Sequence, residues 1–121
     1  MQFNEIHADA RGKISLLTED MKWDEVTVFK TNAGFARGGC IHEQSDEYTV
    51  IIEGEVIYNI AGHNLTMRAG DNYTIRKGTP HYFISVTDSI VLEWGAKPEE
   101  KKEKHLQSRA IVDNFNKGKI I

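Results

Sequence analysis

The chain has 121 residues and a mass of 13.7 kDa, with 40% apolar residues, 27% charged residues and a net charge of −3. These values are typical of one globular domain and exclude a disordered chain, a membrane-spanning helix and, with Cys40 as the single cysteine, a disulfide scaffold. Because charges of opposite sign are mixed along the chain, we expect neither nucleic acid nor a membrane as partner. Together with the single cysteine and the lack of a long apolar segment, this composition leads us to expect a soluble cytoplasmic protein.

Short segments rich in β-branched and aromatic residues recur along most of the chain, separated by turns that contain glycine. We expect strands around residues 13–17 and at residues 25–29, 48–52, 56–60, 72–75, 82–86 and 89–94. Strands of this length, at intervals of about 8–12 residues, are typical of a sandwich or a small barrel. The expected fold class is therefore all-β, with the barrel over residues 1–96.

The segment at residues 48–52 is apolar on both faces, because Thr49 and Ile51 alternate with Val50 and Ile52. A strand that is apolar on both faces is covered on both sides. The barrel interior can cover one side, while the other side needs a second sheet or a second subunit. We therefore expect a homodimer that packs through this sheet.

The composition changes at Lys97, where a run of charged residues begins. Pro98 suits the start of a helix, and the apolar residues Val112 and Phe115 follow later. We expect residues 97–121 to form a short helical or extended tail that docks on the barrel.

Four residues with metal-binding side chains are candidates for a site: Cys40, His42, Glu47 and His81. Cys40 and His42 are two residues apart, so on a strand their side chains leave the same face. Glu47 opens the next strand and can return toward that face. A thiolate, an imidazole and a carboxylate that converge in this way can bind a metal, although a histidine in a strand can also be a hydrogen-bonded structural residue.

The spacing of these residues resembles the two sequence motifs of the cupin superfamily. The first motif has glycine, histidine, histidine, glutamate and glycine, and its positions fall here on Gly34, Cys40, His42, Glu47 and Gly54. The second motif has glycine, proline, glycine, histidine and asparagine, and its positions fall on Gly70, Arg76, Gly78, His81 and Ser85. Cysteine thus replaces the first histidine, and the proline and the asparagine are also replaced.

The resemblance implies a double-stranded β-helix, which is a jelly-roll barrel, over roughly residues 29–94. It also implies one divalent metal inside the barrel, held by Cys40, His42, Glu47 and His81. A thiolate among the ligands favours Zn²⁺, Fe²⁺ or Ni²⁺ over Mn²⁺ or Mg²⁺. If Cys40 is instead a buried packing residue, three ligands remain, which is enough for a catalytic metal.

The alternation of side chains indicates which residues line the cavity around this site. Thr49 and Ile51 share a face with Glu47, and Phe83 and Ser85 share a face with His81. Arg37 is an odd number of residues from Cys40 and points away from the cavity on a regular strand. A bulge at residues 38–39 can turn it inward, where it can bind an anion.

Two short segments suggest the reaction. Residues 9–14 and 37–42 resemble segments of cupin-type deoxysugar epimerases and ketoisomerases, which move a proton next to a carbonyl. We therefore favour an enzyme that acts on a sugar or a sugar nucleotide, with His42, Glu47 and His81 as the catalytic residues. The alternatives are an iron-dependent dioxygenase and a non-catalytic module that binds a small molecule or a metal, as in a sensor.

Overall fold

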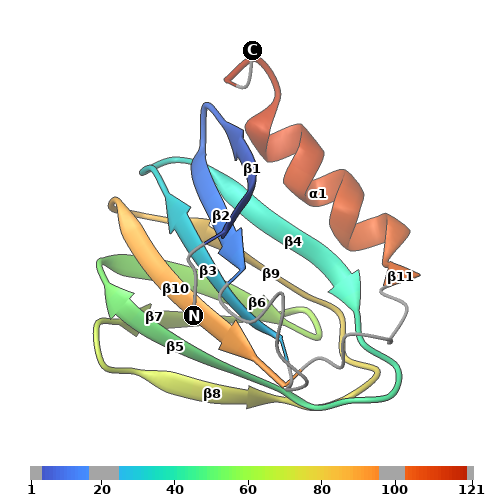
Figure 1. Ribbon diagram of the computed structural model, residues 1–121. Coiled ribbons are helices and arrows are strands. Elements are labelled where there is room, and N and C mark those ends of the chain that lie inside the picture. Colours follow the sequence, from blue (N-terminus) through green and yellow to red (C-terminus); the bar gives the residue numbers. More distant parts are fainter. Residues whose placement is uncertain (1–3, 17–24, 96–102, 120–121) are drawn as a thin grey trace.

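The computed structural model describes residues 4–16, 25–95 and 103–119 of the chain (Figure 1). The elements in chain order are β1 (Asn4–Asp9), β2 (Gly12–Leu16), β3 (Val26–Thr31), β4 (Ala36–Ile41), β5 (Glu47–Glu53), β6 (Glu55–Ile60), β7 (His63–Arg68), β8 (Asn72–Ile75), β9 (His81–Ser85), β10 (Ser89–Trp94), β11 (Glu103–Lys104) and α1 (Leu106–Asn116). The predicted all-β class is confirmed, and the helix lies in the tail, as the sequence indicates.

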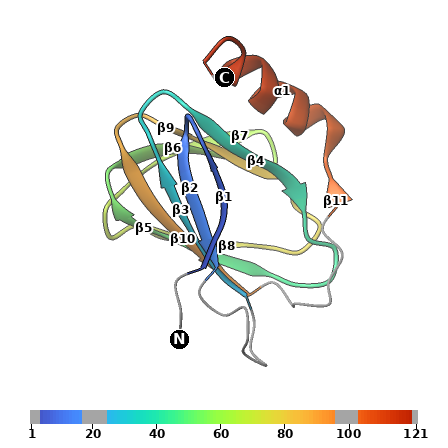
Figure 2. The same cartoon turned by 45° about the horizontal axis from the view of Figure 1, so that its top comes forward.

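The strands form two antiparallel sheets that curve around a common interior (Figure 2). One sheet has six strands in the order β1-β2-β3-β10-β5-β8, and the other has five in the order β11-β4-β9-β6-β7. Strands that follow one another in the chain, such as β3, β4 and β5, alternate between the sheets. This alternation is the connectivity of a jelly-roll barrel, so the predicted architecture is confirmed.

The interior between the sheets holds one apolar cluster. Its buried members are Ile51, Val56, Tyr58, Ile60, Met67, Ile75, Phe83 and Val91. Thr49 and Ile51 on β5 and Phe83 and Ser85 on β9 point inward and are at most 2% exposed. Of these four predicted lining residues, Phe83 lines the cavity of the site, and the other three are packed in the interior. Burial of each large apolar side chain contributes about 1.5–3 kcal/mol to folding, so these alternating positions fix the register of both sheets.

Strands β1 and β7 lie where we expected no strand. β1 precedes the first expected strand, and β7 lies between the expected strands at residues 56–60 and 72–75. Five of the six β7 residues are exposed, because β7 lies at the edge of its sheet. Its segment has only one β-branched residue, Thr66, so it lacks the β-branched and aromatic composition by which the other strands were identified.

A β-bulge interrupts the pairing of β4 with β9, between Gly38 and Cys40. Gly38 and Gly39 have φ angles of 109° and 93°, a region that favours glycine. A Cβ atom on Gly38 would lie 2.9 Å from the Cα atom of Tyr82, so the bulge also requires glycine for space. The glycine pair thus sets the shape of this strand.

The bulge changes which residues of β4 face the interior. Arg37 is paired with Phe83 before the bulge, and Cys40 is paired with His81 after it. Both residues line the interior cavity, although they are three positions apart. The inward orientation of Arg37, which requires the bulge, is therefore confirmed.

The C-terminal segment packs along β4, on the outside of the barrel (Figures 1 and 2). The backbone N–H of His105 donates to the carbonyl of Gly39 at 2.9 Å, and Nη1 of Arg109 donates to the carbonyl of Gly38 at 2.7 Å. The tail thereby satisfies the carbonyl groups at the bulge and holds its conformation.

The helix α1 begins at Leu106, with His105 as the N-cap, while Pro98 lies outside the described residues. The side-chain amide of Asn116 exchanges two hydrogen bonds of 2.8 Å with the backbone of Ala36, and Val112 is fully buried. The described part of the tail therefore packs against the barrel. None of the described helices is long and apolar enough to cross a membrane.

The outer face of the six-stranded sheet exposes large apolar side chains. Ile52 is 54% exposed and Tyr48 is 40% exposed, and the ring of Tyr48 stacks on Trp94 at 5.6 Å. These residues point away from the barrel interior, as the alternation along β5 predicts. The homodimer that would cover this face stays a prediction.

Candidate metal centre

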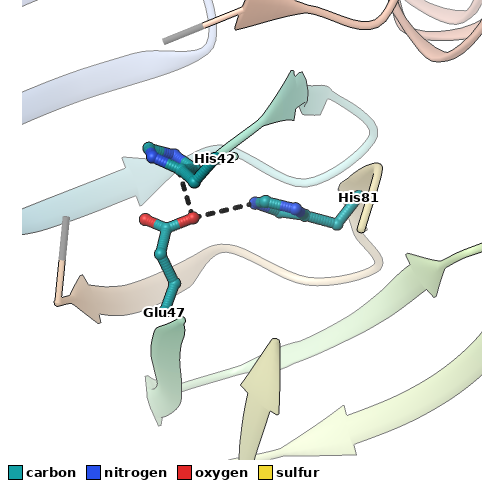
Figure 3. Close-up of side chains that lie close together, drawn as sticks. All are labelled: His42, Glu47 and His81. Atoms are coloured by element: carbon teal, nitrogen blue, oxygen red, sulfur yellow. Dashed lines mark ion pairs between the residues drawn. The ribbon is translucent and has the colours of Figure 1, made fainter. Parts of the chain in front are cut away.

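Three of the four predicted ligands meet inside the barrel: His42, Glu47 and His81 (Figure 3). His42 follows the last residue of β4, Glu47 opens β5, and His81 opens β9. Glu47 therefore comes from the six-stranded sheet, while His81 comes from the five-stranded sheet. The three side chains converge because these strand ends lie on the same side of the barrel.

Hydrogen bonds donated by backbone N–H groups connect the loop before His81 to the loop that carries His42. The N–H of Gly78 donates to the carbonyl of His42 at 2.7 Å, and the N–H of Lys77 donates to the Asp46 carboxylate at 2.9 Å. These bonds connect the two segments that resemble the cupin motifs. They explain how residues almost forty positions apart form one site.

The ligand atoms of the three residues face one another at short distances. Oε1 of Glu47 lies 3.0 Å from Nε2 of His42 and 3.3 Å from Nε2 of His81 (Figure 3). The three side chains are only 6–7% exposed. One ligand atom from each residue lies within 4.8 Å of the other two.

The contacts within the cluster shift the pKa values of its members. Burial raises the pKa of Glu47, but hydrogen bonds from His42 and His81 outweigh it and lower that pKa to about 2. Burial lowers the pKa of His81, but the hydrogen bond to Glu47 and the charges of Glu93 and Glu47 raise it to about 9. In the protein without a ligand, the cluster is thus an ionised carboxylate with a protonated His81.

The cluster fits a divalent transition metal. Nδ1 of His81 lies 3.0 Å from the carbonyl oxygen of Thr79, and a proton donated there leaves Nε2 as the ligand atom. Imidazole nitrogens and carboxylate oxygens bond to such metals at about 2.0–2.2 Å, which separates neighbouring ligand atoms by about 3 Å. The distances of 3.0 and 3.3 Å between Glu47 and the two histidines agree with this spacing.

Cys40, the fourth predicted ligand, lies beside this cluster. Its Cα is paired with that of His81, and the residue lines the same cavity. Its thiol does not belong to the group of ligand atoms that lie within 4.8 Å of one another. The role of Cys40 as a fourth ligand stays a prediction.

Glu93 is a site residue that the sequence did not lead us to expect, and Tyr58 of the buried core is its hydrogen-bond partner. The Tyr58 hydroxyl donates a short hydrogen bond to Oε2 of Glu93, and Glu93 lines the cavity. Burial is the main cause that raises the pKa of Glu93, followed by the charge of Glu47. The alternation along β10 could have identified Glu93, because it shares the inward face of Val91.

The cluster opens into a cavity of about 420 Å³, which is the size of a small-molecule site. Apolar side chains from both sheets line much of its wall, including Ile14, Leu16, Phe29 and Phe83. A polar cluster in a mostly apolar cavity of this size suits a small-molecule ligand. The site residues and the cavity together have the arrangement of a cupin.

The chain belongs to the cupin family. Residues 29–94, more than half of the chain, match the Cupin domain family. The chain is also 33% identical over 64 residues to the "HTH-type transcriptional regulator PuuR" of Escherichia coli (strain K12), a match that covers 52% of this chain and 35% of the regulator. It therefore spans about a third of the length of the curated relatives it matches.

Solved structures with the same fold include proteins of different kinds. A double-stranded β-helix protein from Klebsiella pneumoniae superposes with a TM-score of 0.68 at 18% identity, covering 84% of this chain and 79% of that one. A cupin-superfamily sugar phosphate isomerase from Silicibacter pomeroyi superposes with a TM-score of 0.63 at 20% identity, covering 75% and 64%. At these identities the likeness establishes the fold alone.

Proposed function

We propose that this cupin binds one divalent transition metal through His42, Glu47 and His81 and catalyses a proton transfer on a small polar substrate. The observation that carries the proposal is the convergence of one carboxylate and two imidazoles, almost completely buried, on one point of the cavity. A buried cluster of titratable groups in a cavity is a common feature of functional sites. Zn²⁺, Fe²⁺ and Ni²⁺ suit these ligands.

A metal bound there supplies Lewis-acid chemistry, which stabilises negative charge that develops on a substrate oxygen. The chain itself supplies a largely buried environment, because the three side chains are only 6–7% exposed. Thr79 orients His81, and Glu47 holds both imidazoles toward the cavity centre. These contacts pre-organise the site before a substrate enters.

The substrate class we propose is a sugar or a sugar derivative, and the reaction is an isomerisation or an epimerisation. The segments at residues 9–14 and 37–42 that resemble deoxysugar ketoisomerases support this class, and a structural neighbour is a sugar phosphate isomerase. Such a reaction needs a side chain that accepts and donates a proton and is not itself a metal ligand. Glu93, buried, hydrogen-bonded to Tyr58 and with a raised pKa, is suited to that task.

The test is exchange of a substrate C–H hydrogen with solvent deuterium, measured across a panel of keto sugars and sugar nucleotides. We expect exchange with at least one substrate, and a fall of orders of magnitude after the metal is removed with a chelator. Glu93→Gln should also slow the exchange, whereas Glu53→Gln, which changes an exposed carboxylate of β5, should not. Exchange that survives the chelator would instead assign His42 as a metal-free base.

The second candidate function is a non-catalytic ligand-binding module. The 33% identity to a transcriptional regulator over 64 residues favours it. The same panel separates the two candidates, because a module of this kind binds one compound tightly and exchanges no hydrogen with any of them. An iron-dependent oxygenase would be identified by oxygen consumption with Fe²⁺ and the bound compound.

A further inference from the structure

Arg37 is a buried cation on the cavity wall with an unused hydrogen-bond donor. The residue is 1% exposed and lines the cavity that contains the metal centre. Its Nε donates to Oγ1 of Thr31 at 2.7 Å, and its Nη2 donates to the carbonyl of Lys30 at 3.4 Å. Its Nη1 has no hydrogen-bond partner among the residues that the structure describes.

No carboxylate of the described residues forms an ion pair with Arg37. Three carboxylate residues line the cavity: Glu25, Glu47 and Glu93. Glu47 contacts the two histidines, and Glu93 accepts a hydrogen bond from Tyr58. Burial and the charge of Arg11 lower the pKa of Arg37 to about 10, although the charge of Asp9 opposes this shift, so the guanidinium stays protonated at neutral pH. A buried charge without a directly bound counter-ion is costly, and a bound anion would offset that cost.

Two other arginines of the same cavity differ from Arg37 in this respect. Arg11 lies 2.6 Å from the carboxylate of Asp9, and Arg109 lies 3.6 Å from that of Asp113. Both add positive charge to this part of the wall, but their charges are partly compensated. Arg37 is therefore the arginine of this cavity that has no carboxylate partner in the described part of the chain and can bind an external anion.

We propose that the substrate carries a carboxylate or a phosphate group and that Arg37 binds this group through Nη1. The apolar wall of Ile14 and Phe29 would then hold the carbon skeleton, while an oxygen of the substrate faces His42, Glu47 and His81. The contact with the metal centre rests on the proposed function, whereas the contact with Arg37 does not depend on it. Guanidinium groups suit this role because they match the planar geometry of carboxylates and the oxygens of phosphates.

The experiment is a titration of the ¹⁵N-labelled, chelator-treated chain with acetate or with inorganic phosphate, followed by NMR against chloride at equal ionic strength. We expect one of the two anions to shift the Arg37 Nε–H resonance and to saturate. Which anion binds distinguishes a carboxylate substrate from a phosphorylated one. Repeating the titration after Zn²⁺ is added separates the two proposals, since binding at Arg37 without any uptake of metal would overturn only the proposed metal-dependent function.

Variants make the assignment specific. Arg37→Met should raise the dissociation constant of the bound anion at least about tenfold, and Arg68→Met, which removes an exposed arginine of β7, should leave it within about twofold. Arg37→Lys keeps the charge but loses the planar donor group, so it should also weaken binding and serves if Arg37→Met does not fold. Equal shifts with chloride, or equal losses in the Arg37 and Arg68 variants, would overturn the inference.

Discussion

The two sheets of the barrel contribute groups of opposite charge to the same cavity. The six-stranded sheet supplies the carboxyl groups of Glu47 and Glu93, while the five-stranded sheet supplies His81 and Arg37. Across the metal centre these charges compensate one another, because Glu47 contacts both histidines. At Arg37 they do not. The charged groups of the metal centre therefore contact one another within the chain, whereas Arg37 forms no ion pair among the described residues.

The largest effect is expected from removal of the imidazole that the five-stranded sheet supplies. His81→Ala leaves only two of the three grouped ligands, so we expect metal affinity to fall by more than about a hundredfold. His63→Ala, which removes an exposed histidine of β7, is the matched control. Competition with a chromophoric chelator measures both. Equal affinities of the two variants would show that His81 is not a ligand.

The charge compensation between the sheets predicts how metal binding depends on pH. His81 has a raised pKa of about 9 without metal, so its proton must leave when Nε2 becomes a ligand. Apparent affinity should therefore rise by about tenfold per pH unit between about pH 6 and pH 8, with release of about one proton per ion. Calorimetry in buffers of different ionisation enthalpy counts these protons, and a pH-independent affinity would contradict the account.

In the metal-free chain, the raised pKa of His81 makes the stability fall as the pH rises, whereas metal affinity rises with pH. The raised pKa of His81 contributes stability that is fully present below its ordinary value of 6.5 and is lost as the pH rises through about 9. Thermal unfolding of the metal-free chain should therefore show a decline in Tm over this range. In His81→Ala that part of the decline should disappear.

A smaller effect is expected at Cys40, which lies next to His81 on the five-stranded sheet. If the thiolate is a fourth ligand, Cys40→Ser should lower the affinity for Zn²⁺ by about tenfold and the affinity for Mn²⁺ by less, because only the soft ligand is lost. Titrations with both metals measure the ratio. An unchanged ratio would mean that Cys40 is only part of the cavity wall.

The outer faces of the two sheets also differ, since α1 packs along β4 of one sheet and the other exposes Ile52 and Tyr48. If a second copy covers the exposed face, the particle mass should be twice the chain mass of 13.7 kDa. Ile52→Lys should reduce it to one chain mass, and Leu65→Lys, on β7 of the other sheet, should not. Sedimentation equilibrium measures the particle mass, and a mass of one chain for the unaltered protein would contradict the dimer prediction.

Much of the barrel could be predicted from the sequence, because its buried strands are rich in β-branched and aromatic residues and are separated by turns that contain glycine. Residues 48–52 and 82–86 have that composition and overlap β5 and β9. β7 was missed because Thr66 is its only β-branched residue, although Leu65 and Met67 alternate with polar residues there. Residue composition identifies the buried strands better than this exposed edge strand, for which the alternation was the available signal.

The site could be predicted in part, for a related reason. His42, Glu47 and His81 have the spacing of the cupin motifs, and the structure brings them together. The position of Arg37 depends on a bulge whose presence two glycines allow but do not require. The pairing of Tyr58 with Glu93 joins β6 to β10, a contact between strands that only the three-dimensional structure reveals.

The most direct measurement is the metal content of the chain, purified without a metal-affinity tag and then incubated with Zn²⁺, Fe²⁺ or Ni²⁺. The account predicts about one divalent ion per chain in the unaltered protein and a near-complete loss in Glu47→Ala, with Glu43→Ala, which changes an exposed carboxylate in the loop before β5, at full occupancy. An unaltered protein that takes up none of the three metals, or a Glu47 variant that retains a full ion, would contradict the central claim.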